Sequence, residues 1–375
     1  MIYLDNAATT KAYKSAADIA VKYYTDEFFN PSALYSRAHN VGIDISVATD
    51  RLAKLFGADK QEIIFTSGAT ESNNFALECG YKNKKGNLVI SGGEHASVYE
   101  TAMKLKNFGR DVRIVPLDSS GIVNEDALIS AIDDNTAIVS VIHVSNETGS
   151  VNNISGLCKK VKAKNAKVVF HSDGVQAAGK IKIDLHSSEI DLYSVSAHKI
   201  GGLKGIGALY VKKGFNMQPL IIGGGQQGGR RSGTENVGGI MAFAEAVEIY
   251  SKAAQNFDAK ALRDYMIGEI IARIDFAVIN GTGDVNSGYV LSVSFDRIKG
   301  EVLAHLLEEK HIIVGLGSAC STHVKQSRVL SQLGLTAKQA DGSIRISFCP
   351  ENTLDEIKFA TAEIITAAKH LKEIL

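Results

Sequence analysis

Between residues 60 and 212 the chain repeats one unit, a short run rich in valine and isoleucine followed by a stretch with helical spacing. The runs lie at 62–67, 87–91, 112–116, 136–144, 167–172 and 191–196, and a further candidate lies at 205–213. Most of them are apolar at consecutive positions, which indicates strands covered by helices on both faces. This pattern predicts an α/β architecture around a mainly parallel sheet of about seven strands.

Two of the intervening stretches show the helical spacing well. The segment from Ser97 to Asn107 gathers its apolar residues on one side, and the segment from Ile154 to Lys164 does the same. In sheets wound in this way, ligands bind outside the carboxyl ends of the strands. The residues that directly follow each apolar run are therefore the first candidates for a functional site.

The pattern changes after a glycine-rich stretch at 221–239 and a helical segment that leads toward residue 260. Apolar runs at 288–295, 311–315 and 343–348, with helical segments at 299–310 and from about 352, predict a compact α+β unit. The 375 residues exceed the size at which one core usually stops growing. We expect a large domain over residues 15–250 and a small domain formed by residues 1–14 and 251–375.

Charge and cysteine usage narrow the function classes. Lys plus Arg and Asp plus Glu each number 41, so the balance gives no reason to expect binding to nucleic acid or to a membrane surface. The four cysteines show no CxxC spacing, which predicts neither disulfides nor a metal site. Without a signal segment or a long apolar stretch, we expect a cytoplasmic protein.

A lysine follows the run at 191–196, where DLYSVS leads directly into AHKIGGLKG. A lysine amine can form an imine with an aldehyde when its surroundings leave part of it uncharged. Ser196 and His198, on either side, are candidate ligands for a phosphate. The alternative interpretation of Lys199 is a solvated loop residue, because lysine is seldom buried.

Two other strand ends offer groups that suit the same aldehyde cofactor. Asp173 in HSDGVQ can face a pyridine nitrogen, with Gln176 three residues on, although a helix N-cap is an alternative for this aspartate. In TSGATESNN, the backbone amides near Ala69 and Thr70 can hold a phosphate at the start of a helix. The Thr70 hydroxyl adds a further donor.

Single polar residues complete the candidate set, and each has an ordinary structural alternative. His95 in GGEH can stack over a planar cofactor or move protons, and Asn146 in SNETG can contact the cofactor or the substrate. Thr234 lies in the glycine-rich stretch. Arg345 in SIRISF can bind a carboxylate, because the guanidinium fork matches the two oxygens.

The cysteine in VGLGSACST stands apart from the other three. It follows an apolar run inside a loop of small residues, so we expect an exposed thiol at Cys320 that can act as a nucleophile and carry a persulfide. Cys79, Cys158 and Cys349 are expected to be ordinary buried cysteines.

Taken in order, the motifs resemble one family. The resemblance rests on YLDNAATT, TSGATESNN, GGEH, HVSNETG, HSDGVQ, SAHK, GGGQQGGRRSGTEN, GSACS and RISF. This set is similar to the cysteine desulfurases of the NifS/IscS type, within the class V aminotransferase fold, and covers essentially the whole chain. The resemblance implies a pyridoxal 5'-phosphate (PLP) enzyme of fold type I that forms a homodimer with active sites at the subunit interface.

The resemblance also implies a role for each candidate. Lys199 would bind the cofactor aldehyde, His95 would stack on the ring and Asp173 would pair with its nitrogen. Gln176 and Asn146 would lie near the ring oxygen, and the phosphate would be held by Ala69, Thr70, Ser196 and His198. Thr234 would reach the phosphate in the neighbouring subunit, while Arg345 would bind the substrate carboxylate.

The implied reaction takes sulfur from L-cysteine. Cys320 would attack the substrate sulfur and become a persulfide, alanine would be released, and the sulfur would pass to an acceptor for iron-sulfur cluster assembly or tRNA thiolation. Gly201, Leu203 and Tyr35 depart from residues that are common in relatives, which affects the expected pocket shape. Alternatives are a selenocysteine lyase, another class V aminotransferase, or a sulfur carrier without catalysis.

Overall fold

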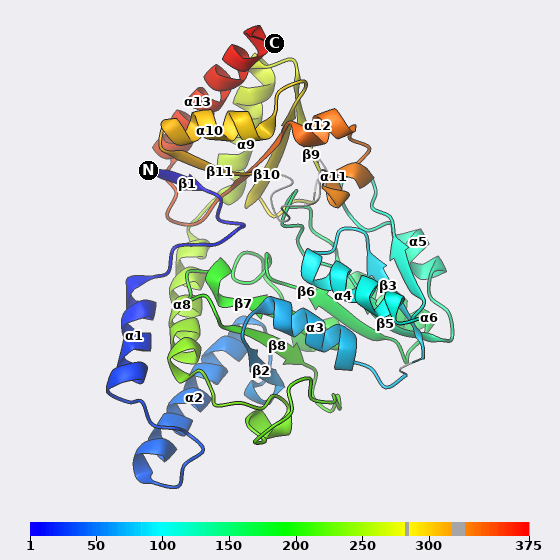
Figure 1. Cartoon of the computed structure of the whole chain (residues 1–375), viewed down its shortest axis with the longest axis vertical. Helices are drawn as coiled ribbons and strands as arrows, with labels where there is room; N and C mark the ends of the chain where they lie inside the picture. The colour runs from blue at the N-terminus through cyan, green and yellow to red at the C-terminus, as the bar shows by residue number, and fades with distance from the viewer. Residues whose placement is uncertain (84, 282–284, 317–326, 375) are drawn as a thin grey trace.

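The structure, a computed structural model, describes residues 1–83, 85–281, 285–316 and 327–374. Its strands form two sheets, which Figure 1 shows one above the other. The larger has seven strands in the order β2-β8-β7-β6-β5-β3-β4, and the smaller has five in the order β1-β11-β12-β10-β9. The expected fold class, a mainly parallel seven-stranded sheet with a smaller α+β part, is confirmed.

The large sheet is covered on both faces, as its continuous apolar runs predict. Its strands are β2 (Ile63–Thr66), β3 (Asn87–Ser91), β4 (Val112–Val115), β5 (Thr136–Ser140), β6 (Val169–Asp173), β7 (Leu192–Ser196) and β8 (Gly207–Val211). Only β8 among them runs antiparallel to its neighbours. Consecutive residues enter opposite cores, since Leu192 packs on one face and Tyr193 on the other.

The helices of this part form two layers. They are α1 (Lys14–Thr25), α2 (Ser36–Leu55), α3 (Ala69–Cys79), α4 (Ala96–Asn107), α5 (Glu125–Ser130), α6 (Ile154–Lys164), α7 (Leu185–Ser188) and α8 (Val237–Gln255), with the short turns η1 (Lys60–Glu62), η2 (Ala197–Lys199) and η3 (Gln227–Gly229). Helices α3 and α4 share a core with Leu192, whereas α2, α6 and α8 share one with Tyr193. Helix α1 packs on α8 (Figure 1).

The small sheet joins the two ends of the chain. Its strands are β1 (Ile2–Leu4), β9 (Ala277–Asn280), β10 (Val290–Phe295), β11 (Ile312–Leu316) and β12 (Ser343–Ser347). The helices after α8 are α9 (Ala259–Arg273), α10 (Gly300–Glu309), α11 (Arg328–Gln332), α12 (Ala337–Asp341) and α13 (Leu354–Glu373). Strand β1 pairs in parallel with β11, and α9, α10 and α13 share one apolar core with this sheet.

No helix in the described part of the chain has the length and apolarity needed to cross a membrane.

The segment that follows β1 connects the two sheets. The side-chain amide of Asn6 donates to the Ser347 carbonyl at 2.9 Å, and the Ala7 amide donates to the Ser347 hydroxyl at 2.8 Å. Toward its other end, the Thr10 amide donates to the His198 carbonyl at 2.8 Å. Residues 6–10, which we call the bridging segment, are thus fixed to β12 on one side and to η2 on the other.

We propose that the chain is divided into a large domain and a small domain, and the cores support this division. Leu4 packs with the small-sheet core, whereas Tyr250 packs with the large-sheet core. Helix α8 continues beyond residue 250 to Gln255, and α9 begins at Ala259. We therefore place the boundary at 256–258, because cutting a continuous helix would divide one packed element between two domains.

Candidate active site

A cavity of about 520 Å³ lies at the carboxyl ends of β5, β6 and β7 and is closed by the bridging segment and by β12. Of the predicted site residues, those that line it are Ala69, Thr70, His95, Asn146, Asp173, Gln176, Ser196, His198, Lys199 and Arg345. Cys320 lies outside the described residues. Thr234 is exposed and borders two smaller cavities instead, one of which shares Ser67 and Gly205 with the main cavity.

Lys199 projects toward the bridging segment. It is the last residue of η2, directly after β7, and its Nζ donates to the Ala7 carbonyl at 2.6 Å and to the Ala8 carbonyl at 2.7 Å. These contacts hold the amine inside the cavity wall. Lys199 is half-buried, and of the two residues whose carbonyls it contacts Ala7 is buried and Ala8 is exposed, which favours a placed amine over a freely solvated one.

Asp173 ends β6 as a buried carboxylate. Its Oδ1 accepts from the Val175 amide at 3.0 Å, and its Oδ2 accepts from Asn73 Nδ2 at 2.7 Å. The N-cap alternative is wrong, since residues 175–180 form turns and no helix begins there. The aspartate instead closes a turn onto its own chain and presents its carboxylate to the cavity.

His95 connects to Asp173 through two residues that sequence reasoning missed. Its Nδ1 lies 2.9 Å from the Ser97 hydroxyl, which accepts from Asn73 Nδ2 at 2.8 Å. Burial lowers the pKa of His95, and the positive charge of Lys199 acts in the same direction, while Asp173 opposes it. Asn73 belongs to the motif TSGATESNN. An asparagine on the buried side of the predicted helix was the sequence signal that could have identified it as a site residue.

The start of α3 lines one part of the cavity. No side chain caps this helix, whose N-cap is Gly68, so the amides of Ala69 and Thr70 begin the helix without a capping partner and border the cavity. His198 also lines the cavity, with Nδ1 3.1 Å from the Thr9 hydroxyl. Burial and the nearby Lys199 lower the pKa of His198 to about 4.

Arg345 combines fixed contacts with one open donor. Its Nη2 donates to Asp5 Oδ1 at 2.8 Å, and its Nη1 donates to the Asn146 carbonyl at 3.1 Å. Its Nε is buried and has no hydrogen-bond partner among the described residues. A buried donor without a partner is costly, so it points to an acceptor supplied by a ligand.

Gln176 is held between the bridging segment and a buried amine. Its Nε2 donates to the Ala7 carbonyl at 2.9 Å, and its Oε1 accepts from Lys180 Nζ at 2.9 Å. Burial and the neighbouring Lys199 lower the pKa of Lys180 to about 7. No feature of the sequence marked Lys180, because its burial follows only from the three-dimensional arrangement of the turn after β6.

The structure explains why glycine stands at position 201, where the residue differs from those common in relatives. A Cβ atom at this position would lie 2.2 Å from the Tyr13 ring, and the residue has a φ of +75°. The Tyr13 ring therefore occupies the space beside Gly201, and the left-handed backbone favours glycine there.

The remaining cysteines differ from expectation. Cys158 is buried as predicted, but Cys79 and Cys349 are only partly buried. The expectation for these two is wrong because Cys79 is the last residue of α3 and Cys349 lies two residues beyond the end of β12, where the cover of the neighbouring elements is less complete.

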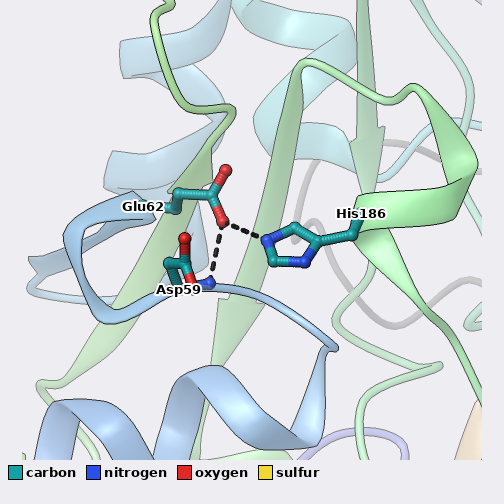
Figure 2. Close-up of side chains that lie close together, drawn as sticks. All are labelled: Asp59, Glu62 and His186. Carbon is teal, nitrogen blue, oxygen red and sulfur yellow. Dashed lines mark hydrogen bonds and ion pairs between the residues drawn. The ribbon is translucent and has the colours of Figure 1, made fainter.

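A separate group of possible metal ligands, Asp59, Glu62 and His186, is shown in Figure 2. The buried Glu62 carboxylate accepts from the Asp59 amide at 2.8 Å, from the Lys213 amide at 2.7 Å, and contacts His186 Nε2 at 2.8 Å. These contacts already connect η1, β8 and α7. The arrangement accounts for the burial of Glu62 as a structural junction.

The sheet, the lysine after β7, the carboxylate that ends β6 and the helix start at α3 fit a cofactor with an aldehyde, a basic ring nitrogen and a phosphate. Together with the solved structures that share this fold, they define a PLP-dependent enzyme of fold type I. The family model described as aminotransferase class-V matches residues 2–359, so the chain belongs to the class V aminotransferase family.

Relatives cover the full chain. A protein of Clostridium botulinum described as cysteine desulfurase IscS is 37% identical over 381 residues, which span 100% of this chain and 96% of the relative. A cysteine desulfurase of Nostoc is 35% identical, covering 99% and 94%. A solved NifS-like protein has a TM-score of 0.90 at 33% identity, covering 99% and 100%, and SspA in complex with cysteine has 0.82 at 32%, covering 94% and 100%.

Proposed function

We propose that this chain is a cysteine desulfurase that converts L-cysteine to L-alanine and collects the sulfur on Cys320. The observation that carries the proposal is the convergence of Lys199, Asp173 and Arg345 on one cavity. The full-length similarity to proteins described as cysteine desulfurases supports it, as does a similar structure described as a complex with cysteine.

The residues around the cavity would hold PLP and govern its chemistry. When bound, PLP supplies an electron sink for the charge that develops on the substrate α carbon. The Asp173 carboxylate would keep a proton on the ring nitrogen, and the Asn73 contact keeps that carboxylate oriented. The free amides of Ala69 and Thr70 would hold the phosphate, together with Ser196 and His198, which also line the cavity.

Substrate binding would use the open donor of Arg345. The Asp5 and Asn146 contacts fix the guanidinium plane, and the unpartnered Nε would be the donor left for a substrate carboxylate. Asn146 contributes its carbonyl to this contact, and its side chain borders the same cavity. Binding would then orient the amino acid with its α proton between Lys199 and His95, the two bases of the site.

Proton movement would depend on these two bases. Burial lowers the pKa of the half-buried His95, which favours the neutral imidazole that can accept a proton, and the Lys199 amine would be the second group able to carry one. Stacking on the cofactor ring remains part of the proposed role of His95. The bridging segment carbonyls that hold Lys199 Nζ would give the amine a defined resting position.

Cys320 lies outside the described part of the chain, and its place in the proposal is supported by the similarity to proteins described as cysteine desulfurases. The proposed step is attack of the Cys320 thiolate on the substrate sulfur, which forms an S–S bond and breaks the C–S bond, and the remaining fragment gains a proton to become alanine.

We include a homodimer in the proposal. Large apolar side chains are exposed on α1, on α2 and on the loops nearby; they are Val21, Tyr24, Phe28, Leu34, Tyr35, Ile43, Val47, Ile221 and Ile222. Patches of this kind are rare on monomers and typical of symmetric interfaces. Thr234 borders the same region beside Phe28, which supports a role toward the neighbouring subunit. Sedimentation analysis should give twice the mass of one chain.

The acceptor and the location belong to the proposal as well. An iron-sulfur scaffold protein or a tRNA thiolation enzyme in the cytoplasm would take the sulfur from Cys320, and the name IscS of one relative supports an acceptor of this kind. Purification with a tagged chain, followed by identification of the proteins that become labelled from sulfur-35 cysteine, would test both acceptors.

The deciding experiment is to trap the persulfide. After incubation with L-cysteine, mass spectrometry of the alkylated protein should find one added sulfur on the peptide that contains Cys320. Cys320→Ser should stop alanine formation, and Lys199→Ala should remove the visible absorbance of the lysine-bound cofactor. The matched control Cys79→Ser should retain both alanine formation and the visible absorbance. Unchanged turnover in Cys320→Ser would instead identify a class V aminotransferase or lyase in which this thiol has no role.

A further inference from the structure

Helix α11 lies against the turn that carries His95. The guanidinium of Arg328 donates through Nη1 to the Gly92 carbonyl and through Nη2 to the Glu94 carbonyl. Its central carbon lies 4.0 Å from the centroid of the Tyr99 ring, one turn into α4. Arg328 therefore contacts the residues immediately before His95 and the helix immediately after it.

A second side chain of α11 strengthens the same contact. Gln332 donates from Nε2 to the Gly92 carbonyl at 3.2 Å and accepts from the Leu117 amide at 3.0 Å. A Cβ atom at Gly92 would lie 2.3 Å from the Gln332 amide, so a side chain at this position would displace that amide from its contacts. The two side chains connect the small-sheet part of the chain to the turn at 92–95.

The charge of Arg328 also reaches His95. The charged groups that face this imidazole are Asp173 from β6, Lys199 from η2, Arg345 from β12 and Arg328 from α11. Asp173 favours the protonated ring, while the three cations disfavour it. Of these three cations, Arg328 is the one whose guanidinium is hydrogen-bonded to the turn that carries His95.

The two acids nearest Arg328 are poor at cancelling its charge. Burial raises the pKa of Glu147, and burial together with Asp173 raises the pKa of Glu94 well above its usual range. A raised pKa disfavours the charged form of each acid and so weakens its ability to offset the guanidinium charge. Its field then acts on the neighbouring imidazole through a buried medium, where screening is weak.

We propose that Arg328 is the positioning residue for His95, because its guanidinium fixes the turn that carries the imidazole and places a positive charge beside it. This inference rests on the proposed function, in which a neutral His95 faces the substrate. Arg328 touches neither substrate nor cofactor in this arrangement, and it acts through backbone contacts and charge alone.

The test compares two substitutions in the holoenzyme. Arg328→Gln removes the charge and the double contact, whereas Arg328→Lys keeps the charge and loses the double contact. NMR of histidine labelled with carbon-13 in the ring, with the signal assigned from His95→Gln, reports the His95 pKa directly. The pH profile of kcat/KM for alanine formation reports the same ionisation in the reaction.

We expect Arg328→Gln to raise the His95 pKa by roughly half a unit to one unit and to move the acid limb of the profile by the same amount. Arg328→Lys should leave that pKa unchanged and lower kcat several-fold. The control Arg273→Gln, an exposed arginine of α9, should change neither.

A wild-type His95 pKa in folded Arg328→Gln would overturn the proposal. If Arg328→Gln does not fold, wild-type kcat in Arg328→Lys would overturn it instead, because the double contact would then have no consequence. Absence of alanine formation by the wild-type enzyme would remove the proposed function, while the NMR comparison would still decide the effect of Arg328 on His95.

Discussion

Replacing Gly174 by alanine should disturb the fold and the cofactor site together. A Cβ atom at this position would lie 1.9 Å from Cζ of Tyr193, whereas carbon atoms normally pack at about 3.5 Å, so one partner must retreat by about 1.6 Å. Tyr193 is fully buried, and its hydroxyl lies 2.8 Å from His143 Nδ1. Because the ring has no space to move, we expect the backbone next to Asp173 to shift.

The expected cost is about 3 kcal/mol of unfolding free energy, at the upper end for an overpacked core. Displacement of Asp173 should also weaken cofactor binding by about tenfold, or roughly 1.4 kcal/mol. The chain has no tryptophan, so urea unfolding is best followed by far-UV circular dichroism, with cofactor binding measured by visible absorbance. The control Gly268→Ala lies in α9 with open space around it and should be slightly stabilising.

A double substitution isolates the contact. If the steric conflict with Tyr193 is the cause, Gly174→Ala should cost much less in a Tyr193→Leu background than in the wild type. A Gly174→Ala protein with the wild-type urea midpoint and wild-type cofactor affinity would refute the reasoning.

Three further substitutions test buried charges. Burial lowers the pKa of Lys180 to about 7, so folding becomes less favourable as the pH falls from about 10.5 toward 7; Lys180→Met should stabilise the protein near pH 7 and flatten the urea midpoint over this range. For Glu62, burial alone would raise the pKa, but hydrogen bonds from two backbone amides and from His186 lower it, so its contribution to stability is lost as the pH falls through this lowered value. Glu62→Gln should remove that loss, which urea unfolding between about pH 3 and 7 would detect. Lys162→Met removes the ammonium that lies 2.5 Å from the buried Asp191 carboxylate, and this should lower the free energy of unfolding by about 3 kcal/mol. An unchanged urea midpoint would contradict this prediction.

Local sequence pattern was sufficient to predict most of the large sheet. Strands β2 to β8 lie within or against the apolar runs, and the helix expected at Ile154 to Lys164 has those bounds in the structure. The cofactor cavity was also predictable in outline, because parallel strands bring their carboxyl ends together and the polar residues come directly after those ends.

Features that depend on distant contacts were not predictable. Helices α1 and α2 begin at N-caps whose side chains make no capping bond, so no start signal marks them. The pairing of β1 with β11 joins residues about 310 positions apart and has no local signature. Asn73 and Arg328 are polar residues whose roles depend on which elements pack beside them, and periodicity contains no information about such partners.

The pairing of the first strand with a late one sets an order of events during synthesis. A ribosome that has released residues 1–250 has produced every strand of the large sheet, yet β11 and β12 have not emerged, and the amino terminus has no strand to join. The carbonyls that hold the Lys199 amine come from this amino-terminal stretch. A nascent chain therefore lacks the β1–β11 pairing and the Ser347 contacts that fix one side of its lysine pocket until translation nears its end.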